Sequence, residues 1–176
     1  DWTISGVNTN NKLLLRLKFD RSEMARLTQN YNNSELLNSD GDPADVARYF
    51  VEEEKDSIHI KQICWFVDET TLGRGLSSVQ RMQMIFDFVQ DRESFERVEN
   101  SLTAGRLRSA EEILYSKKAT AMDRAMLAAT IYSTMNYKVN ILQTRNGRVA
   151  LEVAEKENVC KDLCGALRND VFSYND

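Results

Sequence analysis

The feature that most constrains this chain is the stretch 121–135, which is apolar on nearly every side of a helix. A helix without a polar face has to be covered on all sides, so we expect it at the centre of the core. Asn136 suits a helix end. Two strands should follow, over 138–144 and 148–154, and the Asn146-Gly147 pair between them is a strong hairpin signal. The sequence therefore predicts a buried helix that leads into an antiparallel hairpin.

Capping residues predict where the preceding helices begin. Asp20-x-x-Glu23, Ser77-x-x-Gln80 and Ser109-x-x-Glu112 resemble capping boxes, and Asp42-Pro43 and Asp56 also suit helix starts. The elements expected before residue 121 are a strand over 12–19, a helix over 21–30, a loop over 31–42, a helix from 43, a helix after Asp56 that Gly73 and Gly75 break, and helices over 78–91 and 110–116. Several helices followed by the buried helix and a hairpin make an α+β layout.

The spacing of apolar residues indicates which helix faces point inward. Two sets share one face each: Ile60, Ile63, Cys64 and Val67 in the helix after Asp56, and Met82, Ile85, Phe86 and Val89 in the helix over 78–91.

Length and charge narrow the classes of function. The chain has 176 residues, which suits a single domain over 1–176. Its net charge of −4 argues against non-specific nucleic-acid binding. No apolar run approaches the roughly 20 residues of a membrane helix, so no span is expected.

The cysteines and the histidine do not suggest a metal centre. Cys160-x3-Cys164 has the wrong spacing for a zinc knuckle, and His59 is the only histidine. We therefore expect small buried thiols, with a Cys160–Cys164 disulfide possible in an oxidising compartment. A catalytic pair of His59 with Cys64 is disfavoured because the two positions do not share a helix face. No metal and no cofactor are expected.

Residues 107–153 resemble the transglutaminase-like cysteine-enzyme superfamily of bacteria and archaea. The family phrase "P-E-E-x-L…G-D-C-x-D-x-A-x-L-x-x-A-L-x-x-x-x-G-Y" followed by "G-H-x-x-x-x-V" is similar to three parts of the chain. These are residues 110–114 (AEEIL), then Asp123, Ala125, Leu127, Ala129, Asn136 and Tyr137, and then Gly147, Val149 and Val153. The recognisable part spans 46–153, which leaves 1–45 as an N-terminal strand–helix extension. The resemblance implies a papain-like α+β core, with the buried helix packed on an antiparallel sheet.

The departures from the family pattern lie at the catalytic positions. Ala119-Thr120-Ala121 stands where the family has Gly-Asp-Cys, and Arg148 stands where it has His. In the family a thiolate attacks an amide carbonyl, and the imidazole delivers a proton to the leaving amine. Ala121 has no attacking atom, and an arginine keeps its proton near neutral pH. The third residue of the family's triad has no convincing match here.

The resemblance therefore implies a catalytically inactive domain that binds a protein or peptide. The alternative is an active amide hydrolase or acyltransferase whose catalytic residues lie elsewhere in the chain. A third possibility is a helical and β scaffold with an accidental likeness. The sequence leaves the oligomeric state open. Members of this family are often exported or tethered, so the resemblance favours an extracytoplasmic location in a bacterium or archaeon.

The binding site expected from this resemblance is basic. Arg148 should face the start of helix 121–135, where free amides and the helix dipole attract anions. Lys118, Thr120 and Arg145 lie close by in sequence. The former active-site groove would then hold a carboxylate or phosphate. The other interpretation is that these charges are ordinary surface.

Overall fold

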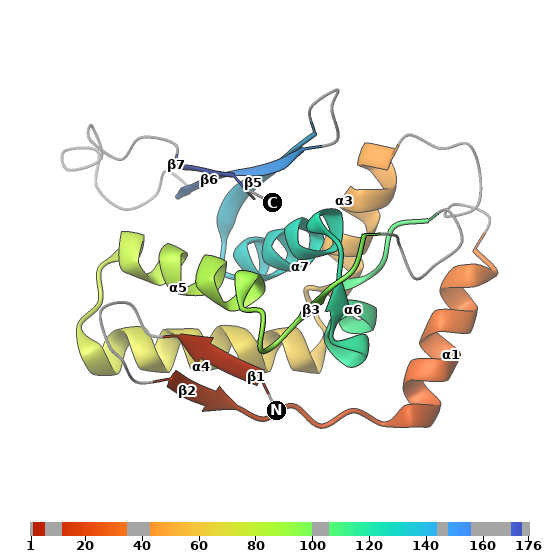
Figure 1. The fold of residues 1–176 in the computed structure, drawn as a ribbon, viewed down its shortest axis with the longest axis horizontal. Coiled ribbons are helices and arrows are strands. Elements are labelled where there is room, and N and C mark those ends of the chain that lie inside the picture. Colours follow the sequence, from red (N-terminus) through yellow and green to blue (C-terminus); the bar gives the residue numbers. More distant parts are fainter. Residues whose placement is uncertain are drawn as a thin grey trace.

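The computed structural model describes residues 2–5, 12–34, 43–99, 106–143, 148–155 and 170–173. Within these ranges the chain forms six α-helices and three small sheets (Figure 1). The helices are α1 (Arg21–Asn32), α3 (Pro43–Glu54), α4 (Ile58–Arg74), α5 (Ser78–Gln90), α6 (Ala110–Ser116) and α7 (Ala121–Thr134). The predicted α+β class is confirmed, and helices make up most of the described chain.

Two of the sheets are two-stranded. β1 (Trp2–Ser5) and β2 (Lys12–Leu15) pair in antiparallel fashion, whereas β3 (Glu96–Arg97) and β4 (Lys118–Ala119) form a short parallel pair. The parallel pair joins the chain after α5 to the chain just before α7.

The third sheet contains the predicted hairpin. β5 (Tyr137–Gln143) and β6 (Val149–Glu155) are antiparallel, with Val139 opposite Val153, and β7 (Asp170–Ser173) adds a third strand beside β6. The hairpin strands were predicted within one residue of their ends. β7 was not predicted, and the turn at Asn146-Gly147 lies outside the described residues.

Helix α7 lies at the centre of the molecule. It contacts α3, α4, α5 and α6 as well as β5 and β6, so helices and sheet enclose it from different sides (Figure 1). Its residues 123–132 are all buried. The prediction of an enclosed helix that leads into a hairpin is confirmed.

The N-terminal segments pack on this body through separate contacts. β1 contacts α5, and α1 contacts α6. The predicted cap Asp20 accepts hydrogen bonds from the amides of Ser22 and Glu23 at 2.8 and 2.9 Å. Ser77 and Ser109 form complete capping boxes with Gln80 and Glu112, as predicted.

Several predicted boundaries were wrong. The first strand ends at Leu15 instead of residue 19, and α1 continues to Asn32 into the predicted loop. Ser57, not Asp56, caps α4, and Asp56 instead binds Lys61 at the surface. Gly73 lies within α4, whereas Gly75 ends it in a left-handed conformation with φ of 61°.

The predicted inward faces are mostly correct. All four of Ile60, Ile63, Cys64 and Val67 are buried. In α5 Phe86 is half-buried and packs against the core, while Met84 and Phe88, which were not predicted, are completely buried.

Candidate functional site

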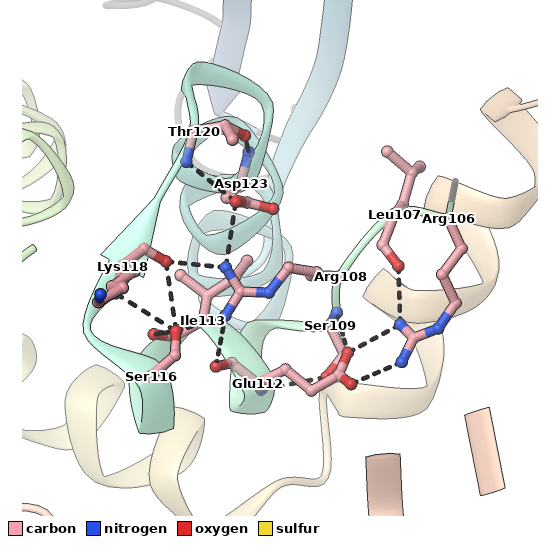
Figure 2. Close-up of polar contacts among 10 residues, drawn as sticks. All are labelled: Arg106, Leu107, Arg108, Ser109, Glu112, Ile113, Ser116, Lys118, Thr120 and Asp123. Atoms are coloured by element: carbon pink, nitrogen blue, oxygen red, sulfur yellow. Dashed lines mark hydrogen bonds and ion pairs between the residues drawn. The ribbon is translucent and has the colours of Figure 1, made fainter. Parts of the chain in front are cut away.

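The start of α7 is the position where the family resemblance places the nucleophile. Thr120 is the N-cap: its hydroxyl accepts from the Asp123 amide at 3.1 Å, and the Asp123 carboxylate accepts from the Thr120 amide at 2.9 Å (Figure 2). Ala121 is half-buried and is the first residue of the helix. The capping box thus brings a carboxylate to the positive end of the helix dipole.

A buried arginine fixes this carboxylate. Arg108 donates to Asp123 at 3.2 Å, to the Lys118 carbonyl at 2.8 Å and to the Glu112 carbonyl at 2.9 Å, and it also bonds the Ser116 hydroxyl (Figure 2). Both side chains of the Arg108–Asp123 pair are almost completely buried. Arg108 therefore holds the end of α6 and the start of α7 in one arrangement.

A second buried ion pair lies at the start of α6. Arg106 donates to both carboxylate oxygens of Glu112, at 2.9 and 2.7 Å, and the same carboxylate accepts from the Ser109 amide (Figure 2). Burial raises the pKa of Glu112, but the hydrogen bonds from Arg106 and Ser109 outweigh it and hold the pKa below its usual value. Glu112 is thus an ionised, fully bonded residue of the interior.

Two of the four site residues predicted from the sequence, Lys118 and Thr120, belong to this network. Lys118 is exposed in β4, where it contacts Glu96 at 3.4 Å. Thr120 is the cap described above. Arg148 is exposed and immediately precedes β6, on the sheet that covers α7. Arg145 lies outside the described residues.

The only histidine of the chain joins three segments. His59 Nδ1 lies 2.8 Å from a carboxylate oxygen of Glu111, its Nε2 lies 2.8 Å from the Lys18 carbonyl, and its ring stacks on Phe19 with centroids 3.9 Å apart. A carbonyl oxygen only accepts, so Nε2 carries a proton. The Ser57 hydroxyl bonds the same Glu111 carboxylate. Both ring nitrogens of His59 are therefore occupied by oxygen partners.

A neutral carboxyl group lies next to this cluster. Glu54 is buried, its Oε2 accepts from the Glu111 amide at 3.2 Å, and its Oε1 accepts from the Tyr31 hydroxyl at 3.4 Å. Burial, reinforced by the nearby Glu111 charge, raises the pKa of Glu54 to about 8, although its hydrogen bonds act in the opposite direction. Glu54 therefore keeps its proton at neutral pH, beside the histidine-bound Glu111.

Sequence reasoning missed the cluster of Glu54, Ser57, His59 and Glu111. The only signal was a pair of adjacent glutamates, Glu111 and Glu112, in a short helix whose other residues are largely apolar. Adjacent glutamates are usually solvated, so the pattern does not distinguish a buried pair from a surface one.

Cys64 has the character of a core thiol. It is buried on α4 and lies 3.9 Å from the Ile131 carbonyl. Burial, together with the charge of Asp68, raises the pKa of Cys64 to about 12. A thiol that stays protonated at neutral pH is a poor nucleophile. The other two cysteines, Cys160 and Cys164, lie outside the described residues.

Two classes of feature are absent from the part of the chain that the structure describes. Its histidine, cysteine and acidic side chains form no group of three or more that could hold a metal ion. None of its helices has the length and apolar character needed to cross a membrane.

Comparison with known proteins gives no relative from which a role could be transferred. No family model matches the chain, and no curated protein or solved structure is significantly similar to it.

Proposed function

We propose that this chain is a non-catalytic transglutaminase-like domain with a papain-like α+β core, and that it binds a protein or peptide. The observation that carries the proposal is the path of the chain at α7. An enclosed helix starts at Thr120-Ala121 and leads directly into the β5–β6 hairpin that packs on it. This is the layout that the resemblance implies, with a methyl group where the family has its thiol.

The state of the other reactive groups supports a non-catalytic role. The Cys64 thiol is buried with a pKa of about 12. His59 contacts Glu111 and Lys18, so its ring nitrogens would have to leave those partners before acting as a base. The Ser57 hydroxyl bonds Glu111 instead of the imidazole, which differs from the order of a serine–histidine–acid triad. The rival hydrolase hypothesis therefore gains no support from this cluster.

Arg148, Lys118, Thr120 and Arg145 are the residues proposed to bind the ligand. Lys118 and Arg148 are both exposed and basic, which suits a carboxylate or phosphate on a peptide. Both amides of the α7 capping box already have partners: the Thr120 amide donates to the Asp123 carboxylate, and the Asp123 amide donates to the Thr120 hydroxyl. A ligand anion would therefore depend mainly on these side chains rather than on the helix dipole.

Titration with acidic and phosphorylated peptides tests the binding site. We expect Arg148→Ala to weaken binding by about fivefold, since a charge-assisted contact at a partly exposed site contributes about 1 kcal/mol. Arg26→Ala, which removes an exposed arginine from α1, is the matched control and should leave the affinity unchanged. Equal affinities of the parent chain and the Arg148→Ala variant would show that Arg148 does not bind the peptide.

A separate assay tests the lack of catalysis. The chain is incubated with glutamine-bearing peptides and with thiol-directed acylating probes, and its intact mass is then measured. We expect neither turnover nor an acyl adduct. A covalent acyl-enzyme would overturn the non-catalytic assignment, whatever the result of the peptide titration.

A further inference from the structure

Helix α4 carries apolar side chains on two opposite faces. The inner face contains Ile60, Ile63 and Val67, which are completely buried. On the outer face Ile58 and Trp65 are 66% and 64% exposed, and Leu72 is 78% exposed. A single exposed apolar residue is ordinary, but three large ones on one helix face indicate a contact surface.

The three exposed residues lie along one side of the helix. They are spaced seven residues apart, which is nearly two helical turns, so each lies about 10.5 Å from the next along the axis. Ile58, Trp65 and Leu72 thus form a stripe about 21 Å long, the spacing by which one helix packs against another. We refer to these three residues as the α4 stripe.

Polar residues flank the α4 stripe on both sides. At 100° per residue, Lys61 and Asp68 lie on one flank, and Gln62 and Glu69 lie on the other. Lys61, Gln62 and Glu69 are exposed and Asp68 is half-buried. Within the chain Lys61 contacts Asp56 at 2.6 Å, and Asp68 accepts from Arg81. Pairs of this kind near the surface contribute little, which leaves these charges available to a partner.

We propose that the α4 stripe is a self-association surface, and that it packs against the same stripe of a second copy in antiparallel orientation about a two-fold axis at Trp65. In this arrangement Ile58 lies opposite Leu72 of the partner subunit, and Trp65 lies opposite Trp65 of the partner subunit. A two-fold interface has to be complementary to itself, and this stripe is symmetric about its central tryptophan.

The charges on the flanks favour the antiparallel orientation. Equivalent flanks meet in an antiparallel pair, so Lys61 lies opposite Asp68 of the partner subunit and Gln62 opposite Glu69 of the partner subunit. In a parallel pair opposite flanks meet, and Asp68 would face Glu69 of the partner subunit. Two carboxylates placed together repel each other, so charge complementarity selects the antiparallel dimer.

Sedimentation equilibrium of the 176-residue chain tests self-association. An interface made mainly by one helix is small, so we expect the average mass to rise from monomer toward dimer between about 5 and 500 µM. Trp65→Glu should keep the chain monomeric throughout this range. Because Trp65 is exposed, this variant should retain its far-ultraviolet circular dichroism. Leu142→Glu, which alters an exposed leucine on β5, is the matched control and should dimerise like the parent chain.

A charge variant tests the orientation. In an antiparallel dimer Gln62→Lys places a new ammonium group opposite Glu69 of the partner subunit at two symmetric positions, and we expect dimerisation about threefold to tenfold tighter. In a parallel dimer the same lysine would lie opposite Lys61 of the partner subunit and would weaken association. A weaker dimer with Gln62→Lys would overturn the antiparallel arrangement. A parent chain that stays monomeric at every concentration would overturn the proposal. The α4 stripe would then be a contact surface for a different protein.

Discussion

Glu54 is a carboxyl group placed where its charge is poorly solvated. Its exposed fraction is 3%, and its nearest acidic neighbour, Glu111, is held by His59 and Ser57. Glu54 keeps its proton at neutral pH, whereas the Glu111 carboxylate is bound by the His59 ring and the Ser57 hydroxyl. Carboxyl groups with a raised pKa occur in active sites and also in buried polar networks. At this position the hydrogen bonds tie α3, α4 and α6 together.

The raised pKa of Glu54 predicts a specific pH dependence of stability. The folded-state pKa is about 8, and the usual value is 4.5, so the folded chain retains a proton that the unfolded chain loses. This contribution is fully present below the unfolded value and is lost as the pH rises through about 8. We expect the free energy of unfolding to fall by a few kcal/mol across this window because of Glu54.

Glu54→Gln isolates this contribution, because glutamine has the same shape and no charge. Urea unfolding should give a free energy that falls less with pH for the variant, so that the variant gains stability relative to the parent chain at about pH 9. Parallel curves for the two proteins between about pH 5 and pH 9 would show that Glu54 ionises normally.

At the scale of helices and strands, local motifs predicted starts better than ends. Asp20, Ser77 and Ser109 cap their helices as expected, because an N-cap bond joins residues at most three positions apart, although only Ser77 and Ser109 complete the predicted capping box. Asp56 was a wrong prediction, since its neighbour Ser57 is an equally good cap and the tertiary contact with Glu111 decides between them. α1 runs past residue 30 because Tyr31 packs on Phe50, which the sequence alone does not reveal.

The candidate site was predictable only where it is local. The sequence pattern places Thr120 and Ala121 at the start of the buried helix. In the structure Thr120 is the N-cap and Ala121 is the first residue of α7. The cluster of Glu54, Ser57, His59 and Glu111 joins two parts of the chain that are more than 50 residues apart, and no short sequence pattern connects positions at that distance. Similarly, β7 pairs with β6 from a segment without a clear strand pattern.

Two glycines at the end of α4 provide a matched test of backbone conformation. Gly75 has φ of 61°, whereas Gly73 lies within the helix, and an added Cβ meets no atom within 4 Å at either position. Gly73→Ala should therefore stabilise the protein by about 0.5–1 kcal/mol. Gly75→Ala should destabilise it by about 1 kcal/mol, because the left-handed conformation strains a residue with a side chain. Urea unfolding of both variants measures the difference, and shifts of the same sign would contradict the assignment of the helix end.

At the scale of the whole molecule, α7 connects the parts of the fold. It contacts four other helices and the strands β4, β5 and β6, so it meets most elements of the described chain. Small residues make this possible: Ala125, Ala128 and Ala129 are essentially inaccessible to solvent and let neighbouring elements approach closely. The stability of the separate layers should therefore depend on the packing around one helix.

Enlarging a buried alanine of α7 tests this dependence. Ala128 is completely buried, so Ala128→Leu should cost about 1–3 kcal/mol through overpacking. Ala25→Leu makes the same change at an exposed position of α1 and should shift stability by less than about 0.5 kcal/mol. Both values come from urea unfolding followed by circular dichroism. Equal effects of the two changes would mean that α7 is less tightly enclosed than described.

The contacts of the His59 imidazole constrain the order in which this part of the protein can form during synthesis. One ring contacts Lys18 on the amino-terminal side and Glu111 much later in the chain. During synthesis residue 18 leaves the ribosome long before residue 111. The ring therefore meets its carboxylate only after α3, α4 and α5 have all been produced. This corner of the protein therefore cannot close before Glu111 has been synthesised.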